Sequence, residues 1–123
     1  MIEYVGELVS NAEATRRADL CPEAGMYHLE IPSSNDRSVV IDAYAVRNLA
    51  AFINFSCEPN LEMRPIASAC GDSRVKRVGF FAKCDINADD ELCYRRDSNA
   101  YSSRARQKEV ECHCGAANCM GYV

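Results

Sequence analysis

The chain has 123 residues and a mass of 13.7 kDa, a length that suits a single domain. Hydrophobic residues make up 48% of it, which suffices for a core and excludes wholesale disorder. The 14 basic and 18 acidic side chains give a net charge of -4, so the totals predict no strongly basic face for nucleic acid. No apolar run approaches the roughly 18 residues of a membrane span, and the N-terminus lacks a signal-peptide pattern.

Short apolar runs separated by turn residues predict a β-rich domain with one or two short helices and long loops. The expected strands cover residues 1–9, 26–31, 39–41, 61–67, 75–82 and 91–94. Pro65 has no backbone N–H to donate, so we expect its strand at a sheet edge. Pro22 and Gly25 predict a loop between the first helix and the next strand.

Two segments predict helices, and a third is polar. Ser10 with Glu13 three residues later forms a capping box, which predicts a helix that starts there and ends before Pro22. Residues 47–55 carry apolar side chains at helical spacing. Residues 95–108 are polar and basic, and they fit either a solvated connecting segment or a contact to an acidic partner.

The eight cysteines are the most informative feature of the composition. An even number could form disulfides, but no export signal is present and the cysteine content is below that of disulfide scaffolds. Three of the cysteines lie close together in Cys112-His113-Cys114-Gly115-Ala116-Ala117-Asn118-Cys119. Cysteines separated by one residue do not easily form a disulfide with each other, but their thiolates can bind one metal ion. Three thiolates need a fourth ligand to complete a tetrahedral zinc site.

The spacing alone leaves the fourth ligand open. His113 lies between two ligands and would point away from a metal that they share, so a distant cysteine is the better candidate. A disulfide cluster and ordinary buried thiols are the alternatives to zinc. For the remaining cysteines a small buried hydrophobic side chain is the expected role. They are Cys21, Cys57, Cys70, Cys84 and Cys93.

Several segments match one known pattern in order and spacing. Residues 52–60 read Phe-Ile-Asn-Phe-Ser-Cys-Glu-Pro-Asn, and the tail has the form Cys-x-Cys-Gly with a further cysteine. Together the segments resemble the SET-domain protein lysine methyltransferases, specifically the heterochromatin-type branch with a cysteine-rich post-SET tail, whose signature is Arg-Phe-Ile-Asn-His-Ser-Cys-x-Pro-Asn. The matching segments are residues 3–8, 13–14, 41–43, 52–60, 80–82, 85–86, 91–92 and 112–119.

The resemblance implies the β-clip or pseudoknot architecture of SET domains, mainly β with short helices, and a C-terminal post-SET tail fastened by zinc. It implies a SET domain over residues 1–97, a linker over 98–111 and a zinc-binding tail over 112–123. It also implies that the N-terminal strand pair, whose Gly-x-Gly turn cradles the cofactor, is missing before Met1. The resemblance further implies that Cys57 is the fourth zinc ligand beside Cys112, Cys114 and Cys119.

The function implied by the resemblance is methyl transfer from S-adenosylmethionine to a lysine of a histone tail or other peptide. The resemblance implies a nuclear, chromatin-associated protein. We expect neither direct binding to nucleic acid nor association with a membrane. Tyr4 and Tyr94 match catalytic positions of the lysine channel, and a tyrosine at 94 resembles the choice that restricts the number of methyl groups. A core aromatic is the alternative role for both. Asn54, the Phe55 backbone and Cys114 match cofactor contacts.

The chain departs from the family pattern at four positions that bear on function. Phe55 replaces a histidine, Ala51 an arginine and Arg47 a glycine. Arg96 occupies the position of the main catalytic tyrosine, for which Tyr101 is a candidate substitute. These departures favour an alternative function, a degenerate SET domain that binds protein or chromatin without turnover. A generic zinc-fastened interaction domain is a third hypothesis.

Overall fold

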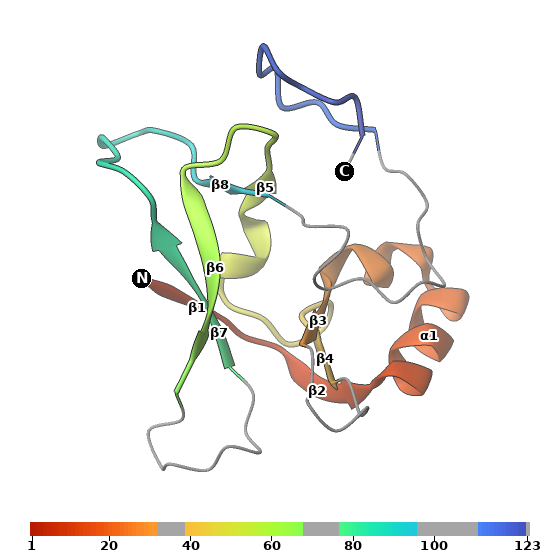
Figure 1. The fold of residues 1–123 in the computed structure, drawn as a ribbon. Helices are drawn as coiled ribbons and strands as arrows, with labels where there is room; N and C mark the ends of the chain where they lie inside the picture. The colour runs from red at the N-terminus through yellow and green to blue at the C-terminus, as the bar shows by residue number, and fades with distance from the viewer. Residues whose placement is uncertain (32–38, 68–76, 96–110, 123) are drawn as a thin grey trace.

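The computed structural model describes residues 1–31, 39–67, 77–95 and 111–122. These residues form two β-sheets with short helices beside them, which confirms the expected mainly β fold (Figure 1). The strands are β1 (Ile2–Tyr4), β2 (Glu7–Ser10), β3 (His28–Ile31), β4 (Val39–Asp42), β5 (Asn54–Phe55), β6 (Leu61–Ile66), β7 (Arg77–Ala82) and β8 (Cys93–Tyr94). The helices are α1 (Asn11–Leu20) and the 3-10 turns η1 (Pro22–Tyr27) and η2 (Leu49–Phe52).

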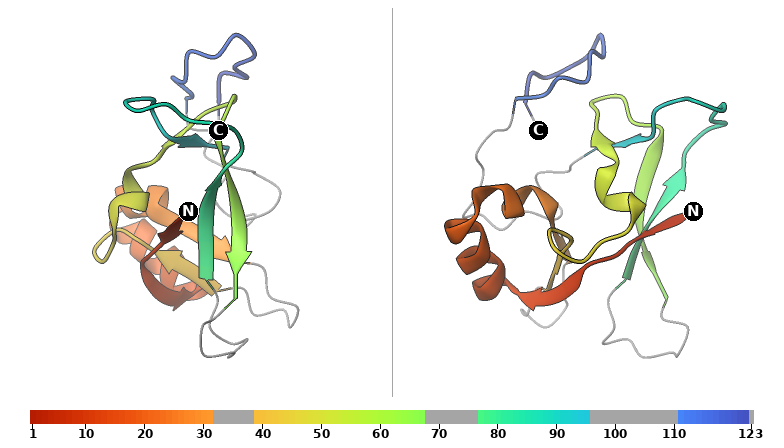
Figure 2. Two further views of the ribbon diagram at one scale, coloured as in Figure 1. Left: turned by 90° about the vertical axis from the view of Figure 1, so that its left-hand side faces the viewer. Right: turned by 180° about the vertical axis from the view of Figure 1, so that it is seen from behind.

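The larger sheet has the order β1-β7-β6-β8-β5, and the smaller one the order β2-β4-β3. Neighbouring strands are antiparallel except around β8, which runs parallel to both β5 and β6. Figure 2 shows the C-terminal tail at one end of the molecule, beyond the end of the larger sheet where β5 and β8 lie. No described helix is long and apolar enough to cross a membrane.

The single strand expected over residues 1–9 is two strands, one in each sheet. β1 pairs with β7 and β2 pairs with β4, so the chain changes sheets at Val5 and Gly6. A Cβ atom on Gly6 would lie 2.5 Å from the carbonyl oxygen of Asp42. The expectation of one strand was wrong. The apolar pattern of the sequence continues through Val5 and Gly6, but the close approach of β4 interrupts the strand there.

The first helix begins and ends where the sequence predicts. Ser10 caps α1, because its Oγ accepts a hydrogen bond of 3.2 Å from the Glu13 amide. The Glu13 carboxylate does not return to the cap, as a full capping box would require. It accepts hydrogen bonds of 2.7–2.9 Å from Arg16 and Arg17, which lower the pKa of Glu13 to about 2.

An ion-pair network attaches α1 to the smaller sheet. Arg17 Nη1 lies 2.8 Å from the buried Asp42 carboxylate and 2.7 Å from the Glu7 carboxylate. The Tyr44 amide donates to the other Asp42 oxygen at 2.9 Å. A buried carboxylate destabilises a fold unless it is paired and hydrogen-bonded, and these contacts meet both conditions for Asp42.

The other expected elements are shorter than the sequence pattern suggests. The loop expected at Pro22 is the 3-10 turn η1, so the next strand starts at His28 rather than at residue 26. The helical spacing over 47–55 yields only η2, which Asn48 caps by accepting from the Ala50 amide at 3.2 Å. The strand expected over residues 91–94 is reduced to β8, which has two residues.

The strands expected over 61–67 and 75–82 form β6 and β7, but the expectation that Pro65 places its strand at a sheet edge was wrong, because β6 lies between β7 and β8. β6 has two neighbouring strands, but β8 pairs with it only at Leu61. On its other side Pro65 is paired with Val78 of β7. Among the described residues, the short β8 therefore leaves the Pro65 end of β6 without a paired strand on the β8 side, which is where a proline is tolerated.

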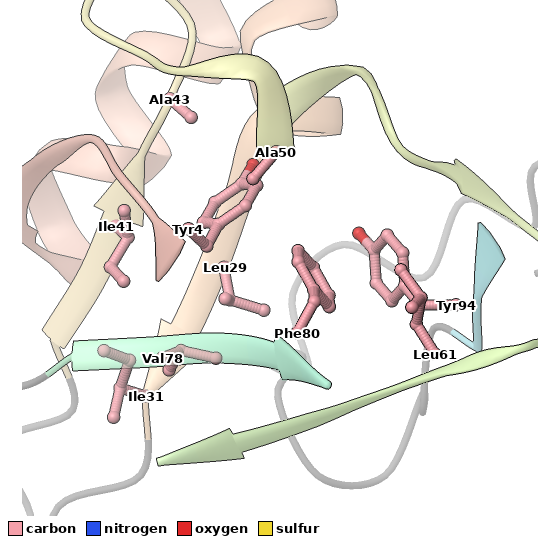
Figure 3. Packing of buried hydrophobic residues seen from close by; sticks show 10 residues of the cluster. All are labelled: Tyr4, Leu29, Ile31, Ile41, Ala43, Ala50, Leu61, Val78, Phe80 and Tyr94. Carbon is pink, nitrogen blue, oxygen red and sulfur yellow. The ribbon is translucent and has the colours of Figure 1, made fainter. Parts of the chain in front are cut away.

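A row of three aromatic rings crosses the core between the sheets (Figure 3). The ring of Phe80, which is 1% exposed, packs edge-on against Tyr4 at 5.9 Å between centroids, and it packs at a tilt of 47° against Tyr94 at 4.6 Å. Val78 from the same strand is equally buried. The core thus fixes the positions of both tyrosines that the sequence singled out.

Replacing Gly6 by alanine should lower the free energy of unfolding of the zinc-loaded protein by about 1–3 kcal/mol, because the new methyl group overlaps the Asp42 carbonyl. Urea unfolding followed by circular dichroism measures the change. Val5→Ala is the matched control, and its effect should stay below about 0.5 kcal/mol because Val5 is exposed. Equal stability of Gly6→Ala and the parent protein would show that the junction tolerates a side chain.

Candidate functional site

Four cysteine sulfurs converge where the tail meets the loop between β5 and β6. The Sγ atoms of Cys57, Cys112, Cys114 and Cys119 all lie within 4.8 Å of one another. Cys57 is buried and the other three are half-buried. The structure therefore brings together all four residues predicted as zinc ligands, although Cys57 is far from the others in the sequence.

The tail folds back on itself to present its three sulfurs. The Cys112 amide donates to the Gly121 carbonyl and the Cys119 amide to the Ala116 carbonyl, both at 3.0 Å. Gly115 and Gly121 have positive φ angles of 67° and 83°, a conformation that other residues rarely adopt. The two turns that close the tail therefore depend on glycine.

The donor set fits a structural zinc ion. A tetrahedron with zinc–sulfur bonds of about 2.3 Å has sulfur–sulfur edges of about 3.8 Å. The Cys57 sulfur lies 3.9 Å from the sulfurs of Cys112 and Cys119. The amides of Met120 and Gly121 point at two of these sulfurs, at 3.5 Å and 3.4 Å, and such donors stabilise thiolates.

The thiols of the metal-free cluster do not share one acidity. Hydrogen bonds from the backbones of Cys57 and Ala116 lower the pKa of Cys114 to about 6. A backbone hydrogen bond from Cys114 lowers the pKa of Cys112, but burial and the neighbouring sulfurs outweigh it and raise that pKa to about 12. Four thiolates therefore do not form together at neutral pH without a cation, and a bound zinc ion would supply that positive charge.

His113 and the remaining cysteines lie outside the cluster. The His113 side chain is 78% exposed and its Nε2 lies 3.9 Å from a Glu111 oxygen, which confirms that it points away from the sulfurs. The expectation of buried thiols is wrong for Cys84, which is exposed because it follows the end of β7. The expectation is also wrong in part for Cys21 and Cys93, which are half-buried. Cys70 lies outside the described residues.

Tyr94 lies directly beside the cysteine cluster. Its carbonyl accepts a 2.9 Å hydrogen bond from the amide of Ser56, the residue before Cys57. Its buried ring packs against Phe55 at 4.9 Å between centroids and against Phe80. The parallel pairing of β5 and β8 sets this register, with Phe55 opposite Tyr94.

Tyr4 is buried on β1, on the opposite side of Phe80 from Tyr94 (Figure 3). Its hydroxyl donates a 2.8 Å hydrogen bond to the carbonyl of Tyr27 at the end of η1. Tyr4 therefore joins β1 to η1.

The two β5 residues expected to contact a cofactor differ in exposure. Asn54 is exposed, and its Nδ2 donates to Glu91 Oε1 at 2.6 Å. Phe55 turns its ring into the core against Tyr94, so that ring is not available to a cofactor and only its backbone can serve. Sequence reasoning gave no role to Glu91, although it belongs to one of the matching segments.

The positions that depart from the family pattern have separate outcomes. Arg96 and Tyr101 lie outside the described residues. Ala51 is half-buried against the core. Arg47, in place of a glycine, has its guanidinium 5.1 Å from the Tyr27 ring centroid and 5.3 Å from that of Phe52, so it covers two aromatic faces.

Comparison with known proteins gives one consistent result. A family model described as SET domain matches residues 1–95. Histone-lysine N-methyltransferase SUV39H2 of Bos taurus is 31% identical over 133 residues, which cover 100% of this chain and 32% of that protein. The chain thus spans about a third of the length of the curated relative.

Solved structures agree with the sequence match. Arabidopsis thaliana SUVH6 in complex with SAM is 33% identical with a TM-score of 0.77, over 98% of this chain and 26% of that one. KRYPTONITE in complex with mCHG DNA and SAH is 33% identical with a TM-score of 0.72, over 98% of this chain and 23% of that one. The expected SET architecture is therefore confirmed.

Replacing Cys57 by serine should abolish zinc retention, because three thiolates cannot close the tetrahedral shell. Native mass spectrometry after dialysis against a chelator should find one zinc per chain in the parent protein and about none in the variant. His113→Ala is the matched control. It removes a potential zinc ligand that lies between two of the cysteines in the sequence but whose side chain faces solvent. Zinc loss in both variants, or zinc absent from the folded parent, would refute this assignment.

Proposed function

This chain belongs to the SET-domain family, and on that premise we propose that it transfers a methyl group from S-adenosylmethionine to a lysine of a protein, with histone tails as the substrate class. The observation that carries the proposal is similarity along the whole chain to a protein named as a histone-lysine N-methyltransferase. The proposed organisation is a SET domain over residues 1–97, a linker over 98–111 and a zinc-binding tail over 112–123.

Zinc has a structural role in this proposal. The four thiolates would fill its coordination shell and leave no position for water or substrate. The ion would hold the tail against the loop after β5, next to Tyr94. Structural zinc sites contribute on the order of 10 kcal/mol of apparent folding free energy, so we expect the tail to lose its order first when zinc is removed.

The cofactor would bind near Asn54, the Phe55 backbone and the tail around Cys114. S-adenosylmethionine supplies a methyl group carried on a positively charged sulfur. The Glu91 carboxylate, 2.6 Å from the Asn54 amide, places negative charge at this edge of the sheet. That charge favours a cationic ligand over a neutral one, which supports the placement.

Tyr94 and Tyr4 would line the channel for the lysine side chain. A neutral amine is needed for the displacement, and it must be aligned with the methyl group and shielded from water. In this proposal the Tyr4 phenol oxygen accepts a hydrogen bond from the amine. The Tyr94 ring, held between Phe55 and Phe80, would form a fixed wall that limits how many methyl groups fit.

The proposed partner is a lysine-containing peptide in the nucleus. The names of the relatives support a histone substrate and a chromatin location. KRYPTONITE was solved with DNA, whereas the net charge of -4 favours a chain that does not itself contact nucleic acid. Absence of direct DNA binding therefore stays a prediction for this chain.

A second candidate function is binding without turnover. Arg96 replaces the main catalytic tyrosine of the family pattern. A guanidinium cannot act as a phenol, and a fixed cation repels a sulfonium. This substitution favours a degenerate SET domain that keeps the zinc-fastened fold and binds a chromatin protein.

Calorimetric titration of S-adenosylmethionine into the zinc-loaded protein distinguishes the two functions. Binding is expected, followed by transfer of labelled methyl groups to histones. Arg96→Tyr should raise the transfer rate if the arginine is the limiting departure from the family pattern. Absence of binding at millimolar cofactor would exclude the methyltransferase for this chain and leave the binding module.

Tyr4→Phe should lower the methyl transfer rate by about 10- to 100-fold, because the amine loses its hydrogen-bond acceptor and its alignment. Initial rates at saturating cofactor measure the effect. Tyr122→Phe removes a hydroxyl from an exposed tail tyrosine and is the control. Unchanged rates in Tyr4→Phe would restrict Tyr4 to its core role.

A further inference from the structure

Asn60 makes hydrogen bonds to two distant segments, although it lies at the end of a surface loop. Its Nδ2 donates to the Glu91 carbonyl at 2.8 Å, and its Oδ1 accepts from the Cys93 amide at 2.9 Å. Its own carbonyl accepts from the Lys83 amide at 2.9 Å. Both ends of its side-chain amide are therefore used within one short stretch before Tyr94.

These contacts differ from those of an ordinary turn asparagine. A turn asparagine bonds its own backbone about two residues along the chain. The side-chain partners of Asn60 are 31 and 33 residues away. Stabilising the local loop does not account for such contacts, whereas docking the segment at 91–93 onto the start of β6 does.

The docked segment carries two residues of the proposed site. Glu91, whose carbonyl Asn60 holds, uses its carboxylate to bind the Asn54 side chain. Cys93, whose amide Asn60 holds, directly precedes Tyr94. β8 has only two residues and pairs with β6 at Leu61 alone. So short a strand has few backbone bonds of its own, and the Asn60 amide supplies two of the contacts that place it.

We propose that Asn60 is a positioning residue that sets where the Tyr94 ring stands in the site. Its side chain fixes the backbone on one side of Tyr94, while the Ser56 amide fixes the Tyr94 carbonyl. The catalytic consequence rests on the proposed methyl transfer. A Tyr94 wall held in this way restricts the number of methyl groups, and a loosened wall admits a bulkier methylated amine.

The structural arm of the test is amide hydrogen exchange, which does not need turnover. Asn60→Leu keeps a similar side-chain volume and removes all hydrogen bonds of the side-chain amide, so the protection of the Cys93 and Ser56 amides should fall about tenfold or more. Asn60→Asp keeps the acceptor for the Cys93 amide and loses the donor to Glu91. In this variant the protection of the Cys93 and Ser56 amides should lie between that of the parent protein and that of Asn60→Leu. Amides of the β6–β7 ladder should stay protected.

The catalytic arm measures the ratio of dimethylated to monomethylated peptide at equal conversion. Asn60→Leu should raise this ratio about threefold and lower kcat about tenfold, with one zinc per chain retained. Asn60→Asp should recover part of both effects. Asn87→Leu is the matched control, because Asn87 is exposed and its side chain bonds locally, to Asp90 three residues along the chain.

Each outcome decides one proposal. Unchanged protection of Cys93 and Ser56 in Asn60→Leu overturns the positioning role. Lost protection with an unchanged product ratio also overturns it, because Asn60 is then structural only. If the parent protein does not turn over, the proposed function fails, whereas the exchange data still decide whether Asn60 places β8. If Asn60→Leu does not fold, Asn60→Asp provides both measurements.

Discussion

The hydrogen bond from the Ser56 amide to the Tyr94 carbonyl is the contact on which the candidate site depends. Three consecutive residues act around it in different ways. The Phe55 ring packs on Tyr94, the Ser56 backbone binds Tyr94, and the Cys57 sulfur joins the tail. Ser56 and Cys57 are both 7% exposed. A shift of this short segment would therefore disturb the aromatic wall and the metal site together.

Polar contacts outside the core help to hold β1, the strand that carries Tyr4, in place. Arg77 makes a two-pronged ion pair with Glu3 at 2.6 and 2.7 Å, which joins β7 to β1 and lowers the pKa of Glu3. Asn48 donates to the Glu3 carbonyl at 2.8 Å and so fixes η2 beside β1. These partly exposed contacts add less stability than the aromatic row, but they set the register of the strand that carries Tyr4.

Features determined by nearby residues could be predicted from the sequence, and features determined by distant segments could not. Ser10 and the following residues specify α1 locally, and the tail cysteines lie within eight positions. The break at Gly6 depends on Asp42, which approaches from another strand. Cys57 is 55 residues from Cys112, so only a family resemblance could connect them. The contacts of Asn60 could not be predicted, because its side-chain partners are 31 and 33 residues away and come next to it only in the folded chain.

Pairing between an early strand and a late strand has a consequence for how the chain folds during synthesis. β1 pairs with β7 in the larger sheet, with Tyr4 opposite Val78. Ribosomes add roughly 5–20 residues per second, so about 4–15 s pass between the synthesis of these two residues. During that interval the edge of β1 and its apolar side chains have no native strand to receive them. The nascent chain should therefore be a client for chaperones until β7 has emerged.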